Sequence, residues 1–226
     1  MSRGYISGTA HMLNMFDFKL AFDEKIEQCF KESDHLVVEL NAVKEIKLKL
    51  SDKVENINAF IEEQAESQQS MDLNFLIQAE EKGKTVYELE TSEFQQQAQK
   101  EYQKDYWKNI TSKLFQRPVF GATPEEEIFY KDLDQQLKQK DDFTREGFQE
   151  GSESKIEFVA NFGLSEGVSK RFYADRNENM AEKIDSLLRK EQGRFFIAIG
   201  AGHVVGKKSV PTLLSQQYKW QIKKMS

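Results

Sequence analysis

Two histidines follow the same kind of short segment near opposite ends of the chain. Gly8-Thr9-Ala10-His11 comes directly after a short apolar run, and Gly200-Ala201-Gly202-His203 comes directly after another. A glycine lets the chain turn sharply where a strand ends, and small neighbours let a ligand approach the backbone. Ligands bind at the carboxyl ends of strands in open α/β sheets. The repeated pattern therefore predicts that both imidazoles meet at one functional site, as metal ligands or as acid–base groups.

Glu39 stands in the apolar segment Leu36 to Leu40 and is the third candidate. A buried ionised carboxylate is costly unless it is paired or binds a metal. Val37 and Val38 are adjacent and both apolar, which does not favour a half-exposed strand with Glu39 pointing outward. Two histidines and a carboxylate form an ordinary ligand set for a catalytic divalent metal with an open coordination position. The same groups could work without a metal, with a histidine as general base and Glu39 orienting it. Their spacing does not separate these two readings.

Other polar residues have an ordinary structural interpretation beside a functional one. Glu90 ends the segment Thr85 to Glu90 and could be an acid at a helix N-terminus. Asp72 precedes or begins a helix and could cap it. Arg176 lies in a mostly charged stretch and could be solvated. His35 is expected to be structural or exposed, and Cys29 to be a small apolar helix residue.

Short apolar runs separated by helical stretches predict an α/β fold with a mostly parallel central sheet flanked by helices. We expect strands at residues 4–7, 36–40, 85–89 and 194–199, a short helix beginning near Pro211, and a last strand at 220–223. Residues 91–190 contain no convincing strand and are expected to form a large all-helical insertion. The whole chain, 1–226, is expected to form one domain.

Composition limits the classes of partner. The 226 residues carry 32 Lys and Arg against 38 Asp and Glu, a net charge of −6, which argues against a nucleic-acid binder. The longest apolar run is too short to cross a bilayer, and the N-terminal residues contain no signal peptide. The expected location is therefore the cytoplasm, with a trimmed secreted form as the alternative. A homodimer stays open, because long helices could pair between copies.

The order of these motifs resembles the TraB/GumN family, which includes PrgY-like pheromone-shutdown proteins and the TIKI metalloproteases. The family's two histidine motifs are resembled by YISGTAHM and FFIAIGAGHVVG. Its strand ending in glutamate is resembled by CFKESDHLVVEL, and its Arg-Asn helix by RNENMAEKIDSLL. Its helix with an acidic start and the strand that follows are resembled by SMDLNFLIQAEEKGKTVYELET. The resemblance implies a compact α/β fold shared more distantly with ChaN-like and erythromycin-esterase-like proteins. It places the following site residues: Gly8, His11, Glu39, Asp72, Glu90, Arg176, Asn177, Gly200, His203 and Gly206.

The preferred hypothesis is a metal-dependent hydrolase, foremost a peptidase. His11, His203 and Glu39 would bind manganese or cobalt, with zinc as a further option, and activate water. Glu90 or Asp72 would serve as base or support the ligands, and Arg176 with Asn177 and Asp72 would contact a peptide or small-molecule substrate. The alternatives are a metal-free, esterase-like hydrolase and a protein that binds a peptide signal without cleaving it.

Overall fold

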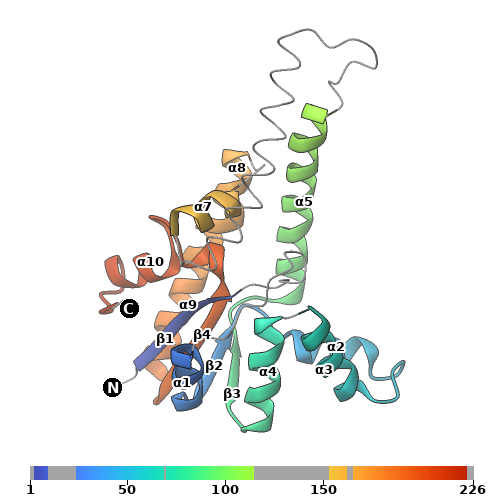
Figure 1. Ribbon diagram of the computed structural model, residues 1–226. Helices are drawn as coiled ribbons and strands as arrows, with labels where there is room; N and C mark the ends of the chain where they lie inside the picture. Colours follow the sequence, from blue (N-terminus) through green and yellow to red (C-terminus); the bar gives the residue numbers. More distant parts are fainter. Residues whose placement is uncertain (1–2, 10–23, 69, 115–152, 162–164, 223–226) are drawn as a thin grey trace.

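The computed structural model describes residues 3–9, 24–68, 70–114, 153–161 and 165–222 (Figure 1). Its centre is a sheet of four parallel strands in the order β1-β4-β2-β3. The strands are β1 (Arg3–Thr9), β2 (His35–Val38), β3 (Thr85–Glu88) and β4 (Arg194–Gly200). The expected α/β class with a parallel sheet and flanking helices is confirmed.

The helices connect the strands and return the chain to the end of the sheet where the next strand begins, as parallel pairing requires. The described helices before β4 are α1 (Glu24–Glu32), α2 (Ala42–Leu50), α3 (Ile57–Gln68), α4 (Met71–Glu81), α5 (Ser92–Leu114), α7 (Glu153–Asn161), α8 (Glu166–Ser169), the π-helix η2 (Lys170–Asp175) and α9 (Arg176–Lys190). After β4 come the 3-10 turn η3 (Ala201–His203) and α10 (Val210–Gln216), which begins near Pro211 as expected.

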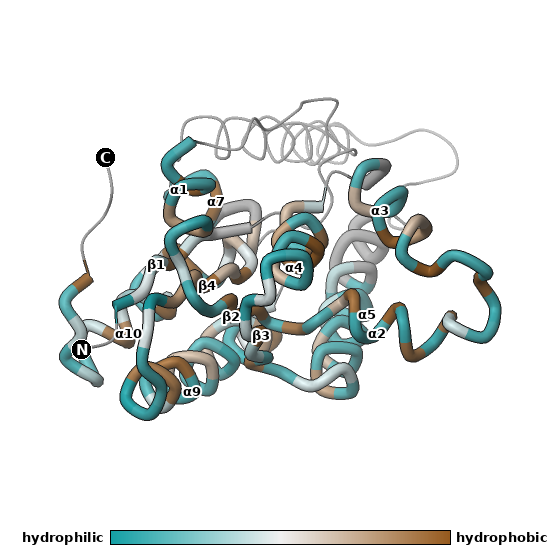
Figure 2. The backbone as a smooth tube through the Cα atoms, turned by 90° about the horizontal axis from the view of Figure 1, so that it is seen from below, coloured by the Kyte–Doolittle hydropathy of each residue, from teal (hydrophilic) through white to brown (hydrophobic). Residues whose placement is uncertain are grey.

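Helices cover both faces of the sheet, with α1 and α4 on one side and α9 and α10 on the other (Figure 2). Alternation along each strand sends side chains to both layers. In β2, Leu36 and Val38 face the α1–α4 layer, whereas Val37 faces the α9–α10 layer. The next residue in this alternation is Glu39, which therefore turns toward α9.

The described residues between 91 and 190 are helical, except Thr91 and Ser165. The last helix of this stretch, α9, packs on the sheet through Met180, Ala181, Ile184 and Leu188 and belongs to the core. By contrast, α5 extends away from the sheet in Figure 1. The division of the chain into one domain with an insertion stays a prediction.

The expected last strand at 220–223 is wrong for residues 220–222, which form no strand, and residue 223 lies outside the described residues. The backbone turns at Lys219, whose φ is 64°. The indole N–H of Trp220 then donates to Asp185 Oδ1 at 2.8 Å, and the guanidinium of Arg189 lies 5.7 Å from the indole centroid. The terminal segment is thus held against α9 by side chains rather than by a ladder of backbone hydrogen bonds.

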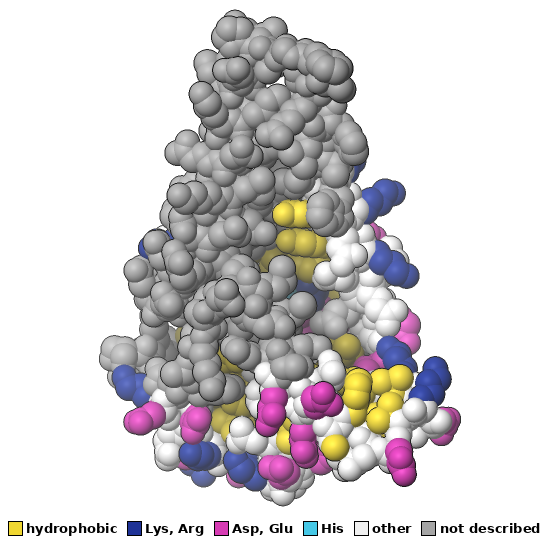
Figure 3. Space-filling model, turned by 45° about the vertical axis from the view of Figure 1, so that its right-hand side comes forward, with side chains coloured by type: hydrophobic (Ala, Val, Ile, Leu, Met, Phe, Trp, Pro, Cys, Tyr) yellow, Lys and Arg dark blue, Asp and Glu magenta, His cyan; other side chains and the backbone are white. Residues whose placement is uncertain are grey.

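Three phenylalanines join α1, α4 and β4 in the core. Phe75 lies 5.0 Å from Phe30 and 4.8 Å from Phe196 between ring centroids. Aromatic contacts of this kind add to the free energy gained from burying the rings. On the surface, charged side chains surround small groups of hydrophobic ones (Figure 3). Leu48 on α2 is 70% exposed there.

Phe75→Ala should therefore lower the free energy of unfolding by about 3–5 kcal/mol, because it empties a site bounded by two other rings. Leu48→Ala should change it by less than about 0.5 kcal/mol. Urea unfolding followed by circular dichroism measures both. A loss below about 1 kcal/mol for Phe75→Ala would contradict the packing described here.

Candidate functional site

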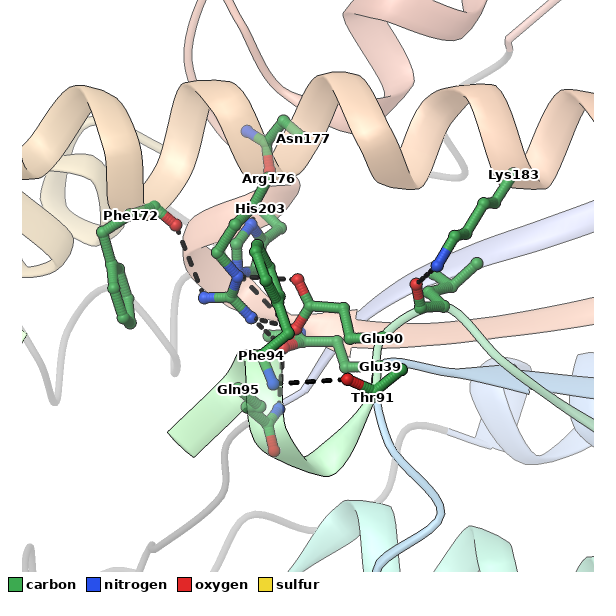
Figure 4. Close-up of polar contacts among 12 residues, drawn as sticks. Glu39, Glu90, Thr91, Phe94, Gln95, Phe172, Arg176, Asn177, Lys183 and His203 are labelled. Carbon is green, nitrogen blue, oxygen red and sulfur yellow. Dashed lines mark hydrogen bonds and ion pairs between the residues drawn. The ribbon is translucent and has the colours of Figure 1, made fainter. Parts of the chain in front are cut away.

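Three buried polar side chains come together where the parallel strands end (Figure 4). Glu39 directly follows β2, Glu90 lies two residues beyond β3, and His203 closes the turn η3 after β4. Their exposed fractions are 5%, 6% and 3%. Backbone pairing continues past the strands, since the Glu90 N–H donates to the Glu39 carbonyl at 2.8 Å. Both acids are therefore held at fixed positions on this edge of the sheet.

Arg176, the first residue of α9, connects the two acids. Its Nε and Nη2 donate to the two carboxylate oxygens of Glu90 at 2.8 and 2.6 Å, and Nη2 also donates to Glu39 Oε2 at 2.8 Å. Its Nη1 donates to the Phe172 carbonyl at 3.4 Å, and the guanidinium lies 4.8 Å from the Phe172 ring centroid. A two-pronged contact of this kind fixes both partners. The alternative interpretation, in which Arg176 is a solvated charge, is wrong because only 3% of the residue is exposed.

The charges stabilise one another. Burial alone would disfavour the charged guanidinium, but its hydrogen bond to Glu90 and the charges of Glu39 and Glu90 outweigh this effect and raise the pKa of Arg176. Two carboxylates against one guanidinium give the buried trio a formal charge of −1. The cluster can thus accept one further positive charge at low electrostatic cost.

Glu39 is also bound on its other oxygen. Oε1 accepts the backbone N–H of Gly200 at 2.5 Å. Gln95, in the first turn of α5, donates through Nε2 to Oε2 at 3.5 Å. This contact was not predicted, because Gln95 begins a glutamine-rich run that is typical of a solvated helix face. Its place in the first turn of a helix that follows a strand end was the available signal.

His203 is oriented by Asn177. The side-chain Nδ2 of Asn177 donates to the Lys208 carbonyl at 2.8 Å, so its Oδ1 faces His203 Nδ1, 2.5 Å away. An amide oxygen can only accept, and His203 Nδ1 therefore carries a proton. In the neutral ring the lone pair is then on Nε2, which lies 3.8 Å from Glu39 Oε1. The Arg-Asn pair of α9 thus positions both site acids and the site imidazole.

Two motif glycines make room for side chains from the helical region. A Cβ on Gly202 would lie 2.6 Å from the ring of Tyr173, whose centroid is 5.3 Å from that of His203. Gly206 has a φ of +88°, which side-chain-bearing residues rarely adopt, and a Cβ there would lie 2.6 Å from Glu157. The glycines after β4 therefore let η2 and α7 pack directly over the histidine turn.

The π-helix η2 sits immediately before Arg176 and supplies Phe172 and Tyr173 to the site. Such wide turns are frequent at functional sites. Tyr102 on α5 packs against Phe172 at 4.7 Å between centroids. Burial is the largest cause that raises the pKa of Tyr173 far above its ordinary value, and the negative charge of Glu39 adds to this effect. The Tyr173 hydroxyl therefore stays protonated.

Asp72 lies apart from the charge cluster, in the first turn of α4. Ser70 is the capping residue of this helix, since its hydroxyl accepts the Leu73 N–H at 3.4 Å. Asp72 instead lines a cavity of about 320 Å³ together with Glu39 and Gln95. The structure therefore places Asp72 near Glu39, across a cavity.

The predicted metal ligands are only partly described. His11 lies outside the described residues, and Gly8 is described only as part of β1, paired with Ile199. Among the described residues there is no group of three His, Cys, Asp or Glu side chains arranged to hold a metal ion. The described part of the site supplies His203 and Glu39, and the third ligand stays a prediction.

Arg176→Met should lower the free energy of unfolding by about 3–5 kcal/mol at pH 7, because it leaves two buried carboxylates without a cation. Their folded-state pKa values would then exceed those of the unfolded chain, and part of the loss should be regained between pH 7 and about pH 5. Urea unfolding at both pH values tests this. An equal loss at the two pH values would argue against the charge cluster.

The matched variant is Glu90→Gln. It leaves Arg176 and Glu39 as a one-to-one pair, so the expected loss is only about 1–3 kcal/mol, without recovery in acid. A larger loss than in Arg176→Met would mean that Glu90 has a role beyond neutralising the guanidinium.

Gly202→Ala should cost about 1–3 kcal/mol, because the new methyl group meets the Tyr173 ring. Gly167→Ala in α8 is the control: the nearest atom to its added Cβ is 3.9 Å away, and alanine is the better helix former. Thermal unfolding of both variants decides the point. Equal stability of the two variants would show that the Tyr173 ring moves aside without loss of free energy of unfolding.

Comparison with known proteins gives one match. The model of the TraB/PrgY/gumN family matches residues 54–221, a range that includes Asp72, Glu90, Arg176, Asn177 and His203 but begins after Glu39. No curated protein and no solved structure matches significantly. Among the described residues, no helix is long and apolar enough to cross a membrane. Since the match covers most of the sequence, the chain belongs to the TraB/PrgY/gumN family.

Proposed function

We propose that this chain is a metal-dependent hydrolase, foremost a peptidase, with its reaction centre at His203 and Glu39. One observation carries the proposal: a buried imidazole, oriented through Nδ1 by Asn177, turns Nε2 toward a buried carboxylate 3.8 Å away at the carboxyl ends of parallel strands. Such edges are where α/β folds bind ligands.

The two residues fit as ligands of one divalent cation. Two ligands about 2.1 Å from a tetrahedral ion lie roughly 3.4 Å apart, close to the observed separation. Asn177 supports the imidazole in the way that outer polar groups commonly orient metal-binding histidines. A carboxylate oxygen has two lone pairs, so Glu39 Oε1 can accept the Gly200 N–H and still bind an ion. The net charge of −1 in the buried trio also favours a cation. His11 is the proposed third ligand, and manganese or cobalt, with zinc after them, the proposed ion.

A divalent cation held here would polarise a substrate carbonyl and lower the pKa of a bound water. The chain's own groups prepare that chemistry. Arg176 keeps Glu39 and Glu90 ionised and fixes their carboxylates. Asn177 keeps the Nδ1 proton on His203. Tyr173 covers the turn that carries His203, Phe172 covers the Arg176 guanidinium, and both limit the access of water.

A metal-free hydrolase is the second candidate, and one observation favours it. Both oxygens of Glu39 already accept N–H donors, from Gly200 and Arg176. In this case His203 Nε2 would take a proton from water as general base, and Glu39 would stabilise the resulting imidazolium. A protein that binds a peptide without cleaving it remains the third.

Metal binding is tested by melting temperature. After treatment with chelator, the protein should gain about 5–10 °C with saturating manganese, cobalt or zinc, because a ligand at a hundred times its Kd adds about 2.7 kcal/mol. His203→Ala should lose this gain. The control is His35→Ala, which removes a histidine bonded to the Gln192 carbonyl at the other end of the sheet and should keep it. No gain with any ion would overturn the metal proposal.

Catalysis is tested separately. Mass spectrometry of peptide mixtures incubated with the metal-loaded protein should show new termini, and chelation or His203→Ala should reduce the rate by at least about 100-fold. Full activity after chelation would select the metal-free hydrolase. Saturable peptide binding with no product would select the binding protein.

A further inference from the structure

The cavity beside Glu39 extends the site beyond Arg176 and His203, neither of which lines it. Gln95 lines the cavity and, like Arg176, donates to Glu39 Oε2 (Figure 4). The cavity, of about 320 Å³, is lined by polar Glu39, Ser70, Asp72 and Gln95 and by apolar Val38, Leu40, Ala42, Ile46, Leu73 and Ala198. Its volume is at the small end of the range of ligand sites, which suits one side chain or one terminal residue rather than a long segment.

The charges of the lining have one sign. Glu39 and Asp72 are its ionisable residues, and among the described lining residues none is basic. Two lysines on neighbouring α2 bind other acids: Lys44 pairs with Glu88 and Lys47 with Glu80. The nearby guanidinium of Arg176 is shared between Glu39 and Glu90, whose combined charge exceeds its own. An occupant with a positive charge therefore meets a complementary field.

Helix N-termini normally attract anions, and three helices begin near this cavity. Each of the three, however, directs the N–H of its third residue to a capping side chain of its own. Lys44 N donates to Asn41, Leu73 N to Ser70 and Phe94 N to Thr91. These three N–H groups already donate to side chains of the protein. The three helix N-termini therefore provide fewer hydrogen-bond donors for a bound anion.

We propose that this cavity is a substrate subsite for a protonated primary amine carried on a short apolar stem. The ammonium group lies between Asp72 and Glu39, and the stem packs against Leu73, Ile46 and Ala198. A lysine side chain and a free peptide amino terminus both present this chemistry. The inference rests on the proposed function, because it assigns the group that the reaction centre receives beside Glu39.

The direct test uses three small probes of equal length: butylammonium, 1-butanol and butyrate. Binding to the chelator-treated protein is measured by saturation-transfer NMR, so that neither metal nor catalysis is required. Butylammonium should bind at least about ten-fold more tightly than 1-butanol, and butyrate should not bind. Asp72→Asn should weaken butylammonium about ten-fold and change 1-butanol less than about two-fold. Glu81→Gln, which removes an exposed acid from the same helix, should change neither.

A second variant keeps the test decisive if Asp72→Asn does not fold. Ala42→Leu fills the cavity without removing a charge and should abolish binding of butylammonium and 1-butanol alike. Equal binding of butylammonium and butyrate, or binding unaffected by both variants, would overturn the subsite. Absence of peptide cleavage alongside the expected probe binding would overturn the hydrolase and leave the subsite standing.

Peptides then separate the two sources of the amine. Matched peptides carry lysine or acetyl-lysine, each with a free or an acetylated amino terminus. If the side chain occupies the cavity, acetylation of lysine raises KM about ten-fold and acetylation of the terminus does not. If the terminus occupies it, the pattern is reversed. In either case Asp72→Asn should make the KM values of the acetylated and unacetylated peptides equal and leave kcat unchanged. Equal KM values for all four peptides with the unmodified protein would overturn the assignment.

Discussion

The guanidinium of Arg176 lies between two carboxylates that end neighbouring strands, and the rest of the site is arranged around it. Glu39 and Glu90 could not both stay ionised at 5% and 6% exposure without a cation between them. The two acids in turn offset the cost of burying the Arg176 guanidinium and raise its pKa. The same helix turn holds Asn177, which orients His203. One turn of α9 therefore fixes the two acids and the imidazole.

This arrangement sets the possible chemistry by dividing the roles of the residues. Arg176 and Glu90 hold charge and position and are remote from solvent. Glu39 and His203 face each other across a gap too wide for a hydrogen bond and suited to an ion or a proton-transfer partner. Gln95 and Asp72 line the cavity beside Glu39. The site thus separates a rigid electrostatic support from the groups that would meet a ligand.

Much of the fold follows from local sequence patterns. Four of the five predicted strands form, because their apolar runs bury side chains on both faces of the sheet. The fifth, expected at 220–223, does not form at residues 220–222. The adjacent Val37 and Val38 correctly indicate that Glu39 is buried. The partner of Glu39 is less predictable, because Arg176 is 137 residues away and stands in a charged stretch that resembles a solvated helix face. The strand predicted at Trp220 is wrong for a different reason. The Trp220 ring contacts Asp185 and Arg189 of α9 and needs no strand pairing to be held in place.

The strand order has a consequence for how the protein is made. β4 is the last of the described strands but lies inside the sheet, between β1 and β2. During synthesis, β1, β2 and β3 leave the ribosome without the strand that joins β1 to the others. Unpaired strand edges of this kind favour aggregation, and they stay exposed until residue 200 has emerged. A polypeptide that ends before β4 therefore cannot form this sheet.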